Sequence, residues 1–174
     1  MSRRLTLNYC PHCGGALEDR QAFGRTRRYC PRCDTIVFRD HKVAAGVLVT
    51  HEGEVLLVRR RLGPRQGRWT FPAGFVDFDE SPAKAAVREC REETGLDVEI
   101  TGLLDVIAGQ EHARGADIVI IFLARLVGGT PKADDDADRV AFFAPDDLPP
   151  LAFHATQIAL EKWLHSQAHT RPTA

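Results

Sequence analysis

The stretch between Ser81 and Gly95 constrains the fold most, because it carries the end signals of one helix. Serine favours the N-cap position, and proline is tolerated at the first helical position, so Ser81-Pro82 predicts a helix start. Gly95 suits the left-handed residue that commonly ends a helix. The sequence therefore predicts a helix over residues 82–94.

This predicted helix crowds carboxylates near its C-terminal end. Glu89, Glu92 and Glu93 stand at positions i, i+3 and i+4, where like charges repel by about 0.2–0.5 kcal/mol per pair. The last two also oppose the helix dipole, at a cost of about 0.3–1 kcal/mol each. The other face is expected to pack on the core through four residues: Ala83, Val87, Cys90 and Thr94.

Two interpretations fit this pattern. The glutamates form a solvated acidic face that Arg88 and Arg91 partly neutralise, or they bind a hard divalent cation, which prefers oxygen ligands. In the second interpretation each carboxylate gains a dipositive partner, and the unfavourable charge pattern is explained. Gly74, upstream, would let the backbone come close to a metal ion or a phosphate.

Residues 74–96 resemble the signature of the Nudix hydrolase family, G-x5-E-x7-R-E-U-x-E-E-x-G-U, in which U is a bulky apolar residue. The following residues match it in register: Gly74, Glu80, Arg88, Glu89, Cys90, Glu92, Glu93, Gly95 and Leu96. The departure is Cys90 at a U position, and a free cysteine packs as a small hydrophobe. The segment before the signature is also similar to that of the family, through Leu57, Arg60, Gly67 and Trp69.

The resemblance implies an enzyme that uses Mg²⁺ or Mn²⁺ to hydrolyse a nucleoside diphosphate linked to another group. It implies carboxylate metal ligands at Glu89, Glu92 and Glu93, with a main-chain carbonyl at or beside Gly74 as a further ligand. It also implies that Arg88 orients the glutamates and that Glu80 is structural or lies outside the direct ligands.

Many members of the family supply a general base from an acidic loop beyond the signature. Here residues 133–138 form such a loop, and Asp136 falls best where relatives usually have glutamate. Aspartate is one methylene shorter, and a merely solvated acidic loop is the alternative. Asp136 is therefore the predicted base.

Four of the five cysteines form two pairs, Cys10-Pro-His-Cys13 and Cys30-Pro-Arg-Cys33. This spacing is typical of a structural zinc site, in which four thiolates leave no open position for water. The alternatives are two disulfides in a secreted protein, or a redox dithiol. The first residues show no apolar segment of a secretory signal, which favours zinc and a cytoplasmic protein.

The remaining pattern predicts a zinc ribbon over residues 1–40, a Nudix domain over 41–167 and a flexible tail over 168–174. Strands are expected at 43–50, 55–60, 97–107, 117–125 and 140–143, and a last helix at 154–166 with an apolar side made of Ala155, Ile158, Ala159 and Trp163. This order favours an α/β/α sandwich, in which helices cover both faces of a mixed sheet. No stretch of 18 uncharged apolar residues occurs, so a membrane span is not expected.

The substrate class follows from the resemblance alone. A zinc ribbon before a Nudix domain is found in bacterial ADP-ribose pyrophosphatase-like proteins and in plant enzymes that hydrolyse FAD; residues 151–153, Leu-Ala-Phe, resemble the latter. NADH pyrophosphatases also carry a four-cysteine module, but residues 108–112 lack their Ser-Gln-Pro-Trp motif. FAD or ADP-ribose is therefore favoured, NADH is third, and AMP is the expected product. Arg60 and Phe153 are candidate substrate-binding residues, although Phe153 could instead be a core aromatic.

The distribution of charge along the chain supports an alternative function, different from nucleotide hydrolysis. The chain carries nine Lys/Arg and four Asp/Glu up to Lys42, whereas the rest is acidic. The ribbon holds a cluster of arginines at positions 20, 25, 27, 28 and 32. Clustered cations favour a nucleic-acid-binding protein or an RNA-decapping enzyme, although four thiolates around zinc would subtract about two charges. Relatives commonly form homodimers, so a homodimer is expected.

Overall fold

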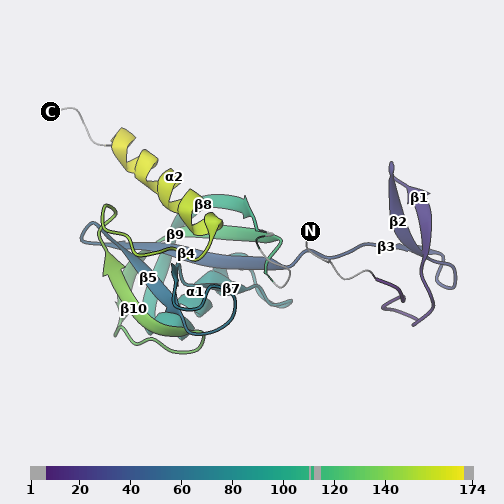
Figure 1. Cartoon of the computed structure of the whole chain (residues 1–174), viewed down its shortest axis with the longest axis horizontal. Coiled ribbons are helices and arrows are strands. Elements are labelled where there is room, and N and C mark those ends of the chain that lie inside the picture. Colours follow the sequence, from purple (N-terminus) through teal and green to yellow (C-terminus); the bar gives the residue numbers. More distant parts are fainter. Residues whose placement is uncertain (1–6, 110, 112–114, 171–174) are drawn as a thin grey trace. The chain divides into compact units, whose positions relative to one another are not determined.

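The computed structural model describes residues 7–109, 111 and 115–170 (Figure 1). The chain divides into two compact units, Met1–His41 and Lys42–Ala174. The division lies one residue beyond the boundary expected from the sequence.

The first unit is a small antiparallel sheet in the order β1-β2-β3, with the bounds β1 (Glu18–Ala22), β2 (Arg25–Cys30) and β3 (Thr35–Val37). Among residues 7–41, its buried cluster consists of Cys10, Leu17 and Cys30, with a few half-buried neighbours. Such a core is too small to stabilise a fold of this length, so the unit needs a cross-link such as a metal ion.

The second unit is built on a mixed sheet in the order β10-β5-β4-β9-β8. Only β4 and β9 pair in parallel, and the other neighbours are antiparallel. The strand bounds are β4 (Val43–His51), β5 (Glu54–Arg60), β6 (Trp69–Thr70), β7 (Ala73–Phe75), β8 (Leu96–Ala108), β9 (Ile118–Gly129) and β10 (Ala137–Phe143). The short strands β6 and β7 pair with β5 and β4.

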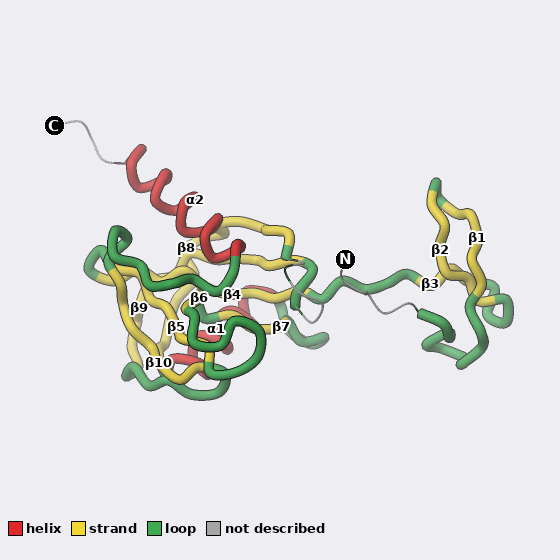
Figure 2. The backbone as a smooth tube through the Cα atoms, viewed as in Figure 1, coloured by secondary structure: helices red, strands yellow, loops and turns green. Residues whose placement is uncertain are grey.

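Two helices, α1 (Pro82–Thr94) and α2 (His154–Thr170), cover opposite faces of this sheet (Figure 2). Apolar side chains on both faces of β4 explain why each face carries a helix, because successive side chains of a strand point to opposite faces. Val47 and Val49 pack in the cluster with α1, whereas Leu48 packs in the cluster with α2. The predicted sandwich with a mixed sheet is confirmed.

The buried stripe of α1 differs from the expected one. Ala83 and Val87 are only half-buried, whereas Ala85 and Ala86 are fully buried. Cys90 and Thr94 are buried as predicted, and Val87 packs against the same cluster. Glu93 also lies in the buried stripe, so its assignment to a separate carboxylate face is wrong. Spacing along the helix could not predict this, because burial of Glu93 depends on a polar partner supplied by β7.

Several elements are longer than expected, and β10 begins at Ala137 rather than at residue 140. Strand β9 continues to Gly129, and its fully buried residues are Ile121 and Ala124. Helix α2 continues to Thr170, so residues 168–170 are helical rather than part of a flexible tail. The rest of the predicted tail, residues 171–174, lies outside the described residues. No helix in the described part of the chain is long and apolar enough to cross a membrane.

Candidate active site

Helix α1 begins and ends where its capping residues predict. The Ser81 side chain accepts a hydrogen bond from the Lys84 N–H at 3.3 Å, which satisfies a free donor of the first turn. Gly95 adopts a left-handed φ of 69° and donates its N–H to the Arg91 carbonyl at 2.8 Å. These caps fix the register of the helix and thereby the positions of its three glutamates.

Arg88 holds the carboxylate cluster together. Its guanidinium lies 2.6 Å from Glu80 Oε1, 2.8 Å from Glu89 Oε1 and 2.9 Å from Glu92 Oε2, and it also donates to the Phe75 carbonyl. The guanidinium lowers the pKa of Glu80, and these carboxylates raise the pKa of Arg88 itself. One fixed cation therefore offsets part of the repulsion, and Glu80 acts on the cluster through Arg88.

Glu93 is the most buried of the three glutamates, with 6% of its surface exposed. Its Oε2 accepts the Ala73 N–H at 3.0 Å. Burial raises the pKa of Glu93 to about 8, and repulsion from Glu89 and Asp136 contributes to the increase. The ionised form of Glu93 is therefore unfavourable with the cations that the described residues supply. A further positive charge beside Glu93 would stabilise it.

Gly74 brings the backbone of β7 directly against Glu89. A Cβ atom at Gly74 would lie 2.0 Å from the Glu89 carboxyl carbon, so any larger residue would displace the Glu89 carboxylate from this position. Burial raises the pKa of Glu89, although Arg88 opposes this effect. The main chain of β7 thus lies against the carboxylates of Glu89 and Glu93. Carboxylate oxygens are ligands of the type that Mg²⁺ takes, although the glutamates do not gather as closely as the four cysteines do among the described residues.

The acidic loop between β9 and β10 packs against the end of α1. The Asp134 N–H donates to the Glu93 carbonyl at 3.2 Å, and the Arg61 N–H donates to the Asp136 carbonyl at 2.8 Å. Asp136 repels Glu93, and Asp135 repels Glu89. The structure therefore brings two aspartates to the cluster, of which the sequence singled out Asp136 only.

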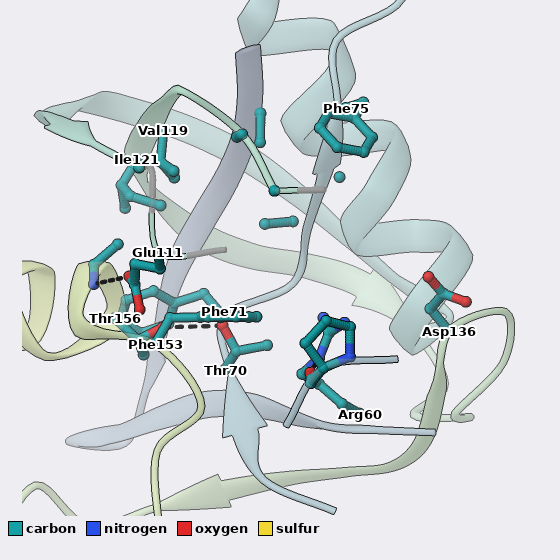
Figure 3. Close-up of a pocket in the computed structure, with 18 residues that line it drawn as sticks. Arg60, Thr70, Phe71, Phe75, Glu111, Val119, Ile121, Asp136, Phe153 and Thr156 are labelled. Carbon is teal, nitrogen blue, oxygen red and sulfur yellow. Dashed lines mark hydrogen bonds between the residues drawn. The ribbon is translucent and has the colours of Figure 1, made fainter. Parts of the chain in front are cut away.

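A cavity of about 310 Å³ adjoins β7, and Gly74 forms part of its wall. Apolar side chains line much of it: Phe71, Phe75, Val119, Ile121 and Phe153 (Figure 3). Arg60 and Asp136 lie at one end of the cavity, away from Glu111. The Arg60 guanidinium stacks over the Phe153 ring, with its central carbon 5.0 Å from the ring centroid. Both candidate substrate-binding residues therefore line the same cavity.

Glu111 is a cavity residue that the sequence analysis did not identify. Its two carboxylate oxygens accept the N–H groups of His154 and Ala155, each at 2.9 Å. Glu111 thus caps the start of α2 directly after Phe153, where a negative charge favours the positive end of the helix dipole. The contact joins residues more than 40 positions apart, and no local sequence signal predicts it.

The four cysteines of the first unit meet as expected. Their sulfur atoms lie within 4.8 Å of one another, and all four are free thiols rather than disulfides. Main-chain N–H groups of Cys13 and His12 lower the pKa of Cys10 to about 6, whereas hydrogen bonds from neighbouring cysteines, above all Cys13, raise the pKa of Cys33 to about 12. Four thiols this close cannot all ionise without a cation, so the cluster is compatible with zinc.

Comparisons with known proteins agree with this arrangement. The NUDIX domain family matches residues 40–164. An ADP-ribose pyrophosphatase of Methanocaldococcus jannaschii is 38% identical over 117 residues, which cover 67% of this chain and 69% of that protein. A crystal structure of a NUDIX hydrolase from Nitrosomonas europaea superposes with a TM-score of 0.82 at 29% identity, over 96% of both chains.

A second kind of relative matches part of the ribbon as well. A NAD-capped RNA hydrolase of Pseudomonas aeruginosa is 34% identical over 147 residues. The match covers 82% of this chain but 50% of the relative, so this chain spans about half of that protein's length.

Proposed function

We propose that this chain, which belongs to the Nudix family, hydrolyses a nucleoside diphosphate linked to another group and releases AMP. The observation that carries the proposal is the set of three glutamates at the C-terminal end of α1. Arg88 holds Glu89 and Glu92, and the Ala73 N–H holds Glu93 beside Gly74, which lines the cavity. The ADP-ribose pyrophosphatase relative supports the same reaction class.

The three glutamates would hold Mg²⁺ or Mn²⁺, together with a main-chain carbonyl at or beside Gly74. The burial of Glu93 and Glu89 supports this assignment, because burial raises the pKa of both carboxyls and a divalent cation would stabilise their ionised forms. A bound divalent cation would neutralise phosphate charge and make a bound water more acidic. Arg88 would keep the carboxylates of Glu89 and Glu92 oriented when a metal ion binds or leaves.

Other residues of the cavity would bind the substrate and accept a proton. Arg60 offers a guanidinium to a phosphate, and its stacking on Phe153 fixes its position. Asp136 or Asp135 would accept the proton of the attacking water, since both act electrostatically on the glutamates. The apolar wall, including Phe153, would hold the base or flavin ring.

ADP-ribose and FAD are the favoured substrates, and NADH is third. ADP-ribose is supported by the Methanocaldococcus jannaschii relative, whereas FAD rests on the resemblance of residues 151–153. A second candidate is the 5′ end of NAD-capped RNA. The Pseudomonas aeruginosa relative favours it, because that match includes part of the ribbon.

A hydrolysis screen tests these assignments. The wild-type protein is incubated with Mg²⁺ or Mn²⁺ and each of ADP-ribose, FAD, NADH, diadenosine polyphosphates and NAD-capped RNA. We expect metal-dependent release of AMP, or of RNA with a 5′ monophosphate from the capped substrate. Cleavage of nucleoside triphosphates alone would contradict the proposal. Size-exclusion chromatography with light scattering tests the expected homodimer in the same preparation.

A further inference from the structure

An exposed phenylalanine stands at the tip of the ribbon hairpin, where the backbone disfavours it. Phe23 and Gly24 form the two-residue turn between β1 and β2, with φ angles of 52° and 72°. Turns with two positive φ angles favour Asn-Gly, and a bulky residue in the left-handed region costs on the order of 1 kcal/mol. Phe23 is nevertheless 76% exposed. Turn chemistry therefore does not explain this residue, and such strain often marks a functional position.

Phe23 belongs to a group of aromatic and cationic side chains on one face of the ribbon sheet. The Phe23 ring stacks with the Phe38 ring at a centroid distance of 6.4 Å and an interplanar angle of 24°. The Arg27 guanidinium carbon lies 5.0 Å from the Phe38 centroid and 5.9 Å from the Phe23 centroid. Arg25 follows the turn and shares the strand face of Arg27, two residues away. We call Phe23, Arg25, Arg27 and Phe38 the tip platform.

The charge of the tip platform is not neutralised within the described residues. No carboxylate there forms an ion pair with Arg25 or Arg27, and the buried Arg27 Nε has no hydrogen-bond partner. Two acidic residues of the unit are engaged elsewhere: Asp19 pairs with Arg28, and Asp34 accepts the Tyr29 hydroxyl. Glu18 lies opposite Tyr29, at the end of the hairpin away from the turn. Flat aromatic surface and unpaired positive charge thus coincide at the tip.

We propose that the tip platform binds single-stranded nucleic acid, with a base stacked on the Phe23–Phe38 pair and phosphates beside Arg25 and Arg27. Unpaired bases stack on exposed aromatic rings without regard to sequence, and adjacent arginines neutralise the backbone. A duplex hides its base faces and offers only phosphates to such a surface. The proposal does not depend on the hydrolytic activity, because no candidate residue of the active site lies in the ribbon.

The aromatic pair could instead stabilise a unit that has very little core. The two interpretations predict opposite effects of Phe23→Asn on stability. Asparagine tolerates a positive φ, so the substitution relieves the turn if Phe23 serves a ligand. If Phe23 holds the ribbon together, the same substitution lowers its melting temperature and its zinc content.

The experiment is a binding titration of the full chain with a fluorescein-labelled oligouridylate, followed by anisotropy without added divalent ions. Phe23→Asn should weaken binding by about 5- to 150-fold, the range for the loss of one stacked base. Its melting temperature and zinc content should equal or exceed those of the wild type. Tyr9→Asn is the matched control, because Tyr9 is a 68% exposed aromatic of the same unit outside the three strands.

Arg25→Gln provides a second variant that does not alter the turn. It should weaken binding and reduce the slope of log affinity against log salt by about 0.7, the contribution of one phosphate contact to a single strand. Duplex RNA should compete poorly with the oligouridylate. The proposal is overturned if the wild type does not bind the oligouridylate, or if Phe23→Asn binds it with unchanged affinity. It is also overturned if duplex RNA competes equally well, or if Phe23→Asn loses zinc.

Discussion

Replacing Glu93 with glutamine should stabilise the protein at alkaline pH in the absence of Mg²⁺ and Mn²⁺. The reason is that burial raises the pKa of Glu93 from 4.5 to about 8, and the Ala73 N–H compensates only in part. The folded protein therefore keeps a proton that the unfolded chain releases above about pH 4.5. This contribution is fully present below pH 4.5 and is lost as the pH rises toward 8.

The magnitude follows from proton linkage. Each pH unit between the two pKa values costs about 1.4 kcal/mol, and the cost levels off near the folded pKa. Between pH 6 and pH 8 the wild type should thus lose about 2 kcal/mol through Glu93 alone. Glutamine keeps an acceptor for the Ala73 N–H but does not titrate, so Glu93→Gln lacks this loss.

Urea unfolding of both proteins at several pH values measures the difference. Trp69 and Trp163 both lie in the second unit, so tryptophan fluorescence reports its unfolding separately from the ribbon. Chelators are omitted so that any metal ion held by the four cysteines of the first unit stays bound. Glu89 also titrates with a raised pKa, but it is present in both proteins and its contribution largely cancels. Parallel pH dependences of the two unfolding free energies would refute the assignment of Glu93 as a buried, undercompensated carboxyl.

Three further substitutions test other parts of the structure. Gly74→Ala should abolish hydrolysis, because the added methyl group would overlap the Glu89 carboxylate; wild-type rates in this variant would contradict the close approach. Glu111→Ala should destabilise the second unit by about 1–2 kcal/mol in urea unfolding, since it removes both acceptors at the start of α2. An unchanged midpoint of urea unfolding would show that this cap is dispensable. Cys30→Ser should lose zinc and solubility, as measured by metal analysis, and a stable variant with full zinc content would argue against a structural site.

Local signals predicted the elements that depend on few neighbours. Ser81 and Gly95 marked the ends of α1 because capping geometry is decided within a few residues. The two cysteine pairs predicted one cluster because a knuckle directs both of its sulfurs toward a common point. Arg60 and Phe153 were candidate substrate-binding residues through the family resemblance rather than from spacing. Both line the cavity, and their binding of substrate stays a prediction.

Contacts between distant segments set the limit of sequence reasoning. The burial of Glu93 depends on the Ala73 N–H from β7, and the cap on α2 depends on Glu111 from the loop after β8. Asp135 reaches the cluster because the loop before β10 folds back onto α1. None of these has a local pattern, since each needs the sheet to bring segments together.

The most direct test of the central claim is Mg²⁺-dependent AMP release from ADP-ribose or FAD by Glu92→Gln. The Glu92 side chain is 47% exposed, so the substitution should leave the melting temperature unchanged while it removes one metal ligand. Glu161→Gln, at an exposed glutamate of α2, is the control. We predict that Glu92→Gln loses nearly all activity and that Glu161→Gln keeps the wild-type rate. Full activity of Glu92→Gln would contradict the assignment of the glutamate cluster as the catalytic metal site.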